Sequence, residues 1–264
     1  MSRTLTILGC GSSGGVPRVA QGWGACDPNN PRNRRRRCSV LVEQADQGVT
    51  QILVDCSPDL REQLLDAEVT RLDGVLITHS HADHTHGMDD LRPLFIAARR
   101  RVDVHMDEAT AAVVRQSFGY LFETPKGSLY PPILNERRLR HGEPCMIDGP
   151  GGALAATPFD LEHGEIKALG LRVGGLAYTP DVNAIDPESA GFLEGLDIWI
   201  VDALRYKPHP SHFSVDEALA WIERMRPRRA IVTNLHTDLD YEELRKRLPE
   251  NVEPAYDGMR IEGF

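Results

Sequence analysis

The chain has 264 residues, of which 41% are hydrophobic and 26% are charged, and its 30 basic and 39 acidic side chains give a formal net charge of −9. This composition is typical of a soluble globular protein and excludes a disordered or collagen-like chain. The acidic balance disfavours binding to long nucleic acid, and no stretch approaches the roughly 20 apolar residues of a membrane span, so no membrane partner is expected.

In chain order, ten short β-rich segments bounded by glycine, proline or polar residues predict strands. They are 4–8, 39–43, 51–55, 74–78, 102–106, 153–158, 169–173, 176–179, 197–202 and 230–233. Helical periodicity predicts helices at 59–67, 89–98, 107–120, 214–226 and 241–247. The early strands follow one another like hairpins and the later ones alternate with helices, which favours a mixed α/β fold in a single domain, 1–264.

Two further features bear on the local structure. Ser214 with Glu217 forms a capping-box pattern that marks the start of the fourth helix. The segment 119–140, which contains three prolines, is the least regular and is interpreted as an insertion or a lid.

Cysteine usage predicts a reducing compartment. The five cysteines form an odd, scattered set without a Cys-x-x-Cys pair, at Cys10, Cys26, Cys38, Cys56 and Cys145. Such a set disfavours both a disulfide framework and a four-cysteine zinc site. The first residues also lack the continuous apolar stretch of a secretory signal, so a cytoplasmic location is expected.

Four of the ten histidines fall within the stretch ITHSHADHTHG, which follows the apolar run 74–77. Imidazole nitrogens and carboxylates are good ligands for divalent metals, so His79, His81, Asp83 and His84 are candidate ligands. Alternation sends His79 and His81 the same way, and the turn that follows can direct Asp83 and His84 to a second point. His86 is not assigned, because its neighbours already supply the ligands.

A site with two metals needs further ligands, and three candidates lie where apolar strands give way to loops. His163, Asp181 and His236 each occupy such a position. Loops held by a rigid scaffold are the usual place for functional groups. Each of these histidines alone fits a structural role better, but together with His-x-His-x-Asp-His they favour a metal centre.

The order His-x-His-x-Asp-His, then a lone histidine, an aspartate and a last histidine, resembles the metallo-β-lactamase superfamily of binuclear hydrolases over nearly the whole chain. The opening LGCGSSGGVP, the strand ILVD at 52–55 and the ending YDGM at 256–259 resemble more narrowly the phosphoribosyl 1,2-cyclic phosphate phosphodiesterases of phosphonate breakdown. The resemblance implies a metallo-β-lactamase-type αββα sandwich of two mixed sheets flanked by helices.

The resemblance also implies a ligand set. One divalent metal would be held by His79, His81 and His163, the other by Asp83, His84 and His236, with Asp181 bridging them. Paired cations of this kind share a carboxylate and a hydroxide and clamp both oxygens of an in-line displacement. Zinc, manganese and iron all suit histidine and aspartate ligands, so the metal is left open. Asp83 is also expected to orient the nucleophile.

His212, in the stretch PHPSHFS, matches the histidine that phosphodiesterase relatives place beside the phosphate. Histidine serves as an acid or a phosphate donor near neutral pH, so His212 is expected to be catalytic and phosphate-binding, ahead of His209. Asp55 and Asp202 are candidates to orient the histidines, since ligand histidines usually donate their other N–H to a carboxylate or a carbonyl. For Asp202, an ordinary turn aspartate is an equally good interpretation.

Two motifs suggest other functions. Gly9-x-Gly11-x-x-Gly14 follows a strand but is not followed by the helix and acidic residue of a dinucleotide site, so we interpret it as a turn bordering the active site. Arg34, Arg35, Arg36 and Arg37 are either solvated charges or phosphate contacts, and four arginines cannot all face one small substrate. Arg37 is the candidate phosphate contact.

One departure from the phosphodiesterases concerns their structural zinc, which they build from an N-terminal cysteine cluster and a late histidine. This chain has Cys26 without neighbouring cysteines, and residues 237–239 supply no second histidine. No structural zinc is therefore expected.

The sequence as a whole predicts a binuclear metal-dependent phosphodiesterase that opens a small cyclic phosphate or a nucleotide phosphodiester through a metal-bound hydroxide. The alternatives are a thioester or lactone hydrolase of the same fold, an RNA-processing nuclease, and a non-catalytic nucleotide-binding module. Homodimers are common among the relatives, but no feature of this sequence decides the oligomeric state.

Overall fold

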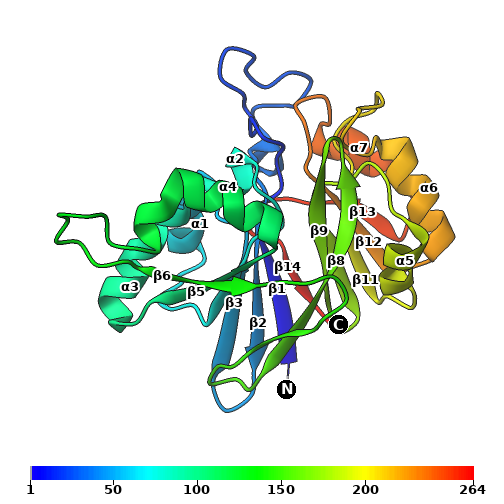
Figure 1. Ribbon diagram of the computed structural model, residues 1–264. Coiled ribbons are helices and arrows are strands. Elements are labelled where there is room, and N and C mark those ends of the chain that lie inside the picture. The colour runs from blue at the N-terminus through cyan, green and yellow to red at the C-terminus, as the bar shows by residue number, and fades with distance from the viewer. Residues whose placement is uncertain (1) are drawn as a thin grey trace.

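The computed structural model describes residues 2–264, and over that range fourteen strands form two sheets of seven (Figure 1). The strands of the first sheet, in spatial order, are β14 (Arg260–Glu262), β1 (Ser2–Gly9), β2 (Ser39–Ala45), β3 (Val49–Val54), β4 (Gly74–Leu76), β5 (Val102–Met106) and β6 (Leu134–Arg138). Those of the second are β13 (Val252–Pro254), β12 (Arg229–Thr233), β11 (Ile198–Asp202), β10 (Leu176–Thr179), β9 (Ile166–Val173), β8 (Leu154–His163) and β7 (Cys145–Ile147).

Both sheets are mixed. In the first, β3, β4, β5 and β6 are parallel neighbours, while β14, β1, β2 and β3 pair antiparallel. In the second, β10 to β13 are parallel and β7 to β10 pair antiparallel. In open α/β sheets, ligands bind outside the carboxyl ends of the strands. Residues that follow the parallel strands of the two sheets are therefore the ones to examine for function.

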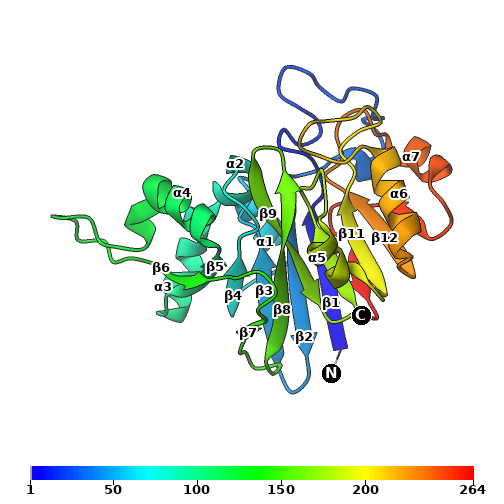
Figure 2. The ribbon, with the colours of Figure 1, turned by 45° about the vertical axis from the view of Figure 1, so that its right-hand side comes forward.

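Three apolar clusters hold the layers together. The central cluster fills the space between the sheets, with Val42 and Ile52 from the first sheet and Leu171 and Ile200 from the second. The helices on the outer face of the first sheet are α1 (Leu60–Asp66), α3 (Arg92–Ala98) and α4 (Glu108–Phe118) (Figure 1). Those on the outer face of the second are α5 (Pro187–Ala190), α6 (Val215–Met225) and α7 (Tyr241–Arg247) (Figure 2). The predicted αββα sandwich is confirmed.

All ten predicted strands and all five predicted helices occur, with ends shifted by a few residues. Four short strands were not predicted, namely β6, β7, β13 and β14, nor were the short helices α2 (Ala82–Thr85) and α5. The segment 119–140, interpreted from sequence as an insertion or a lid, contributes β6, the edge strand of the first sheet, so part of it belongs to the sheet. Within residues 2–264, no helix combines the length and apolarity needed to cross a bilayer.

Candidate metal centre

Four of the predicted ligands lie close together at or just beyond the ends of β4, β8 and β10. His79 and His81 follow β4, His163 is the last residue of β8, and Asp181 lies just beyond β10. His163 Nε2 lies 3.1 Å from His81 Nδ1 and 3.4 Å from Asp181 Oδ2, and His79 Nε2 lies 3.7 Å from the same oxygen. One ligand atom from each residue falls within 4.8 Å of the others, a spacing that can hold a metal ion.

A second group of donors forms on the other side of Asp181. His84 Nε2 lies 3.2 Å from Asp181 Oδ1 and 3.5 Å from Asp83 Oδ2. The two carboxylate oxygens of Asp181 thus face different histidines, Oδ1 toward His84 and Oδ2 toward His79 and His163. This is the arrangement that a bridging carboxylate requires.

The donor chemistry fits divalent cations. Nε2 of His79 and Nε2 of His84 are buried and have no hydrogen-bond partner within residues 2–264. Buried polar atoms almost always have a partner, so two orphaned imidazole nitrogens facing one carboxylate are typical of metal ligands. Burial, with the positive charges of neighbouring histidines, lowers the pKa of His79 well below its usual value, which favours the neutral form that binds metal.

Asp55, which the sequence suggests as a carboxylate that orients a histidine, lies against His84. Its Oδ2 lies 2.7 Å from His84 Nδ1, and its Oδ1 accepts from the backbone N of Thr78 at 2.8 Å. Asp55 has a φ of +65°, a left-handed conformation that aspartate tolerates better than most residues. Burial lowers the pKa of His84, but the carboxylates of Asp181, Asp55 and Asp83 outweigh it and raise the pKa well above its usual value.

The ring of His163 is oriented by a group that sequence reasoning missed. Its Nδ1 lies 2.6 Å from the carbonyl oxygen of Ser211, which leaves Nε2 to face Asp181. Ser211 is next to His212 in the chain, so the loop that carries the predicted acid also orients a predicted ligand. A backbone carbonyl has no side-chain signature, so the sequence offers no signal for this contact.

His212 lies beside the first donor group. Its ring centroid is 4.7 Å from that of His163, and its Nδ1 lies 2.8 Å from Asp202 Oδ2. Burial opposes protonation of His212, but Asp202, Asp181 and Asp83 outweigh it and raise its pKa to about 9. Burial raises the pKa of Asp202 to about 7. Asp202 thus contacts His212, one of the two histidine roles considered for it, and the catalytic role of the pair stays a prediction.

The structure does not bring His236 into either donor group. Its Nε2 lies 2.5 Å from Nη1 of Arg18, a residue that sequence reasoning did not single out. Its Nδ1 lies 3.2 Å from Asp238 Oδ1. A guanidinium always donates, so Nε2 is the acceptor and Nδ1 carries the proton. The lone pair on Nε2 of His236 is thus engaged by Arg18 in this structure, and the role of His236 as a ligand of the second metal stays a prediction.

The remaining predicted residues belong to neither donor group. Nε of Arg37 lies 3.0 Å from Asp59 Oδ2. His209 lies in the loop between β11 and α6, where its Nδ1 is 3.2 Å from Ser211 Oγ. Cys26 is buried beside Arg35, and the expectation of no structural zinc stays a prediction.

Comparison with known proteins identifies the class. The family model of the β-lactamase superfamily domain matches residues 50–234, which include six of the seven predicted ligands. The chain therefore belongs to the metallo-β-lactamase superfamily of hydrolases, as predicted.

Within this superfamily the chain resembles a crystal structure described as a new diphosphatase from the PhnP family, with a TM-score of 0.89 and 35% identity over 100% of this chain and 98% of that one. It is 32% identical over 258 residues to an octanoyltransferase of Porphyromonas gingivalis, matching 96% of this chain and 50% of that protein, so it spans about half the length of that relative. The Zn²⁺-bound PqqB of Methylobacterium extorquens shares the fold, with a TM-score of 0.76 and 16% identity over 98% of this chain and 99% of that one.

Proposed function

We propose that this protein is a phosphodiesterase that uses two divalent cations, zinc or manganese, with iron as the third choice, to hydrolyse a small cyclic phosphate or a nucleotide phosphodiester. The observation that supports phosphate chemistry most directly is the His212–Asp202 pair beside the donor groups. Hydrolysis of a phosphodiester leaves an alkoxide that needs a proton, and a protonated imidazole supplies one at neutral pH.

The candidate ligands would form two metal sites that share Asp181. His79, His81, His163 and Asp181 would hold one cation, and Asp83, His84 and Asp181, with His236, the other. Such cations neutralise phosphate charge and lower the pKa of water.

In this proposed reaction, Asp83 and His212 transfer the two protons. Asp83 orients the attacking water and accepts its proton, and the water oxygen forms a bond to phosphorus. As the bond from phosphorus to the leaving oxygen breaks, His212 donates a proton to that oxygen from Nε2, because Nδ1 is engaged by Asp202. The products are a phosphomonoester and an alcohol.

A diphosphate is the second candidate substrate. The relative with a TM-score of 0.89 is described as a diphosphatase. The chemistry is closely related, since the phosphorus is attacked by water in the same way and only the leaving group changes from an alcohol to a phosphate. The same donor groups and His212 serve both reactions.

The test is metal analysis of the purified protein followed by a substrate screen. Metal-loaded protein is assayed with bis(p-nitrophenyl) phosphate, 2′,3′-cyclic nucleotides, a dinucleoside diphosphate, a thioester, a lactone and a precursor tRNA. Two metals per chain with cleavage of small phosphate substrates support the proposal. Turnover of only the thioester, the lactone or the tRNA overturns it in favour of that chemistry, and binding of nucleotides without any turnover indicates a non-catalytic module.

The setting of the reaction is part of the proposal. All five cysteines are free thiols in the structure, which suits the reducing cytoplasm that we propose. The substrate is taken to be a small molecule rather than long nucleic acid, given the net charge of −9.

A further inference from the structure

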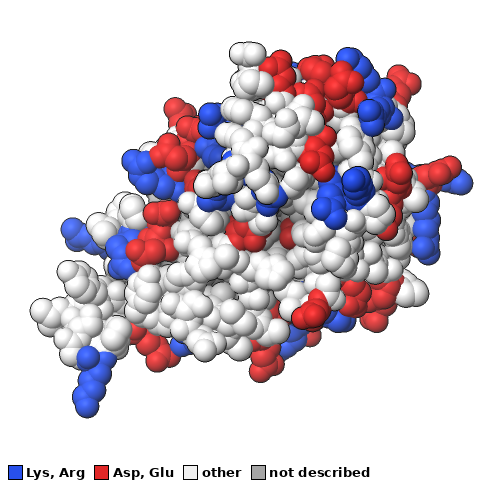
Figure 3. Space-filling view, turned by 90° about the horizontal axis from the view of Figure 1, so that it is seen from above, with Lys and Arg blue, Asp and Glu red and all other residues white. Residues whose placement is uncertain are grey.

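Asn234 is a buried polar residue to which the proposed reaction assigns no role. It directly follows β12 and has a φ of +62°, a left-handed conformation that asparagine tolerates better than most residues. It is only 2% exposed, so it lies beneath the face seen in Figure 3, where acidic atoms near the centre are flanked by basic side chains. A side chain buried in this way acts on the site through the groups that it contacts.

The amide nitrogen of Asn234 contacts the candidate bridging aspartate and the residue before it. Nδ2 donates to the carbonyl oxygen of Pro180 at 3.1 Å and to Oδ1 of Asp181 at 3.3 Å. Both partners are acceptors, so the nitrogen of the amide rather than its oxygen must face them. Among residues 2–264, no other side chain apart from the histidines donates a hydrogen bond to the Asp181 carboxylate.

This hydrogen bond reaches one particular oxygen of Asp181. Oδ1 is the oxygen that lies 3.2 Å from His84 Nε2 in the second donor group, whereas Oδ2 lies 3.4 Å from His163 Nε2 in the first. The torsion that rotates an aspartate carboxylate has broad minima, so the torsion alone does not fix which way the two oxygens face. A donor on Oδ1 opposes this rotation and keeps Oδ1 toward the second donor group.

The backbone around Asp181 is held on both sides. Asn234 engages the carbonyl of Pro180, and Asp202 Oδ2 accepts from the backbone N of Val182 at 3.0 Å. Nδ2 of Asn234 also lies 3.1 Å from Nδ1 of His212, which Asp202 engages, so the amide packs against the imidazole there.

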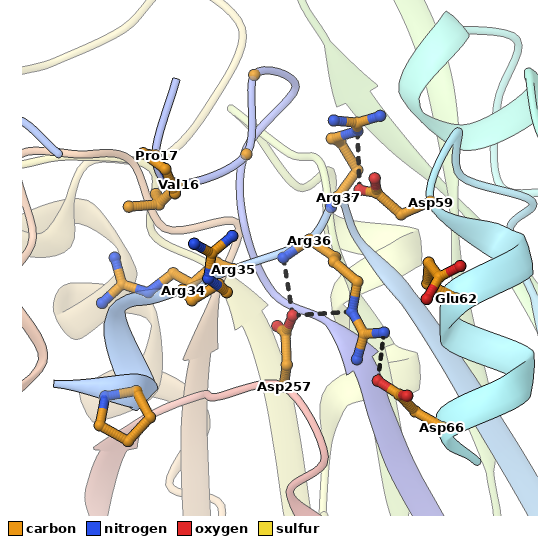
Figure 4. Close-up of a pocket in the computed structure, with 13 residues that line it drawn as sticks. Val16, Pro17, Arg34, Arg35, Arg36, Arg37, Asp59, Glu62, Asp66 and Asp257 are labelled. Atoms are coloured by element: carbon orange, nitrogen blue, oxygen red, sulfur yellow. Dashed lines mark hydrogen bonds and ion pairs between the residues drawn. The ribbon is translucent and has the colours of Figure 1, made fainter. Parts of the chain in front are cut away.

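The turn that carries Asn234 is itself anchored to the loop after β1. The backbone N of Leu235 donates to the carbonyl oxygen of Cys10 at 2.8 Å. The backbone N of Cys10 donates to Asp257 Oδ1 at 3.1 Å, and Asp257 Oδ2 accepts from the backbone N of Arg36 at 2.8 Å (Figure 4). None of these four anchoring residues belongs to a donor group, so the position of the amide does not depend on a bound cation.

We propose that Asn234 is a positioning residue that keeps the Asp181 carboxylate turned with Oδ1 toward the second donor group, so that this group can bind its cation. The second group depends on Asp181 more than the first, because it has three donors whereas the first has four, three of them histidines. Partners of metal ligands typically contribute about 10- to 100-fold to metal affinity or activity. The inference rests on the proposed function, since it takes Asp181 to be shared by two cations.

The test measures the two metal affinities separately. Metal-free wild type and Asn234→Gly are titrated with Co²⁺, which takes imidazole and carboxylate ligands, and followed by visible absorption and calorimetry. Glycine removes the amide and accepts the left-handed φ. We expect Asn234→Gly to bind one Co²⁺ nearly as wild type does and the other about 10- to 100-fold more weakly. An equal loss at both sites, or no loss at either, overturns the proposal.

Asn135→Gly is the matched control. Nδ2 of Asn135 donates to Oδ1 of Asp103 at 2.8 Å, so the variant loses the same kind of hydrogen bond in the edge strand β6, outside both donor groups. It should keep both affinities, and a selective loss of one Co²⁺ in this variant would overturn the specific role of Asn234. Asn234→Ser, which keeps one donor, should show an intermediate loss and provides the test if the glycine variant does not fold. Melting temperatures of the metal-free proteins monitor folding.

The titration needs no substrate, so it separates failure of this inference from failure of the proposed function. Wild type that binds fewer than two Co²⁺ would contradict the binuclear site itself and, with it, the role of Asn234. Two bound Co²⁺ with unchanged affinities in Asn234→Gly would overturn only the role of Asn234. If no phosphate ester is cleaved but the selective loss of one Co²⁺ is observed, the role of Asn234 stands and the hydrolytic function fails.

Discussion

Asp202 Oδ2 lies 2.8 Å from His212 Nδ1, and the same oxygen accepts from the backbone N of Val182 at 3.0 Å. The Asp202 carboxylate is therefore held both by the backbone just after β10 and by the imidazole of His212. This contact favours the tautomer in which Nδ1 carries the proton, and it leaves Nε2 available for the acid role that we propose for His212.

Replacement of His212 tests its role as the acid. We expect His212→Gln to reduce kcat by about 10²- to 10⁴-fold, the usual contribution of a positioned acid. Metal content should be unchanged, because His212 is not in either donor group. Steady-state kinetics and elemental analysis check this. Loss of metal from the variant would show that His212 is a ligand and that the proposed proton donor lies elsewhere.

Asp83 is expected to matter for turnover and little for folding. Its side chain is partly exposed and lies near His84 at the start of α2. We expect Asp83→Asn to lower kcat at least about 100-fold, since removal of a positioned proton acceptor costs on that scale, while the melting temperature of the metal-free protein stays within a few degrees of wild type. Full activity at full metal occupancy would remove Asp83 from the mechanism.

Metal removal should destabilise the protein. The buried Nε2 atoms of His79 and His84 have no hydrogen-bond partner among the residues that the structure describes, so a bound cation supplies interactions that the unfolded chain does not have. Ligand binding to the folded state at 100 times its Kd adds about 2.7 kcal/mol, so chelation should lower the melting temperature by several degrees. Asp181→Ala is the control, because it removes the shared carboxylate and should abolish the shift. An unchanged melting temperature for wild type, with metal loss verified, would argue against this centre.

Asp257 predicts a pH dependence of stability away from the site. Burial raises its pKa to about 6, although Arg36 and Cys10 donate to it. The folded state therefore binds more protons than the unfolded state between about pH 4 and pH 6, and this group stabilises the fold at acidic pH and loses that contribution as the pH rises through 6.

The measurement for Asp257 is urea unfolding of metal-free wild type and Asp257→Asn at pH 4.5 and 6.5. The variant should gain stability relative to wild type between the two pH values, by at most about 3 kcal/mol for a shift of roughly two pKa units. A relative loss of stability by the variant over this range would mean that the ion pair with Arg36 outweighs burial.

Much of the fold and the donor set could be predicted from the sequence, because the informative residues are local. His79, His81, Asp83 and His84 fall within six positions, and each predicted strand carries its own apolar run. The strands β6, β7, β13 and β14 could not be predicted, since they have three to five residues and lie at or near the sheet edges. A strand such as LNERR in β6 has no apolar alternation to detect.

The contacts that complete the site were not predictable for a different reason. Ser211 acts through a backbone carbonyl, and Arg18 meets His236 across 218 positions of the sequence. Neither contact leaves a pattern of residue types in a single chain. The glycine motif after β1 gave only a partial indication, that a turn borders the site, whereas the structure shows which arginines that turn accommodates.

The first and last strands of the molecule, β1 and β14, are antiparallel neighbours, with Thr4 opposite Glu262. The two ends of the chain lie at the side away from the loops that carry the histidines (Figure 1). A second protein module could therefore be joined at either end without obstructing substrate entry. Fluorescent fusions and surface immobilisation through either terminus should leave the catalytic face open.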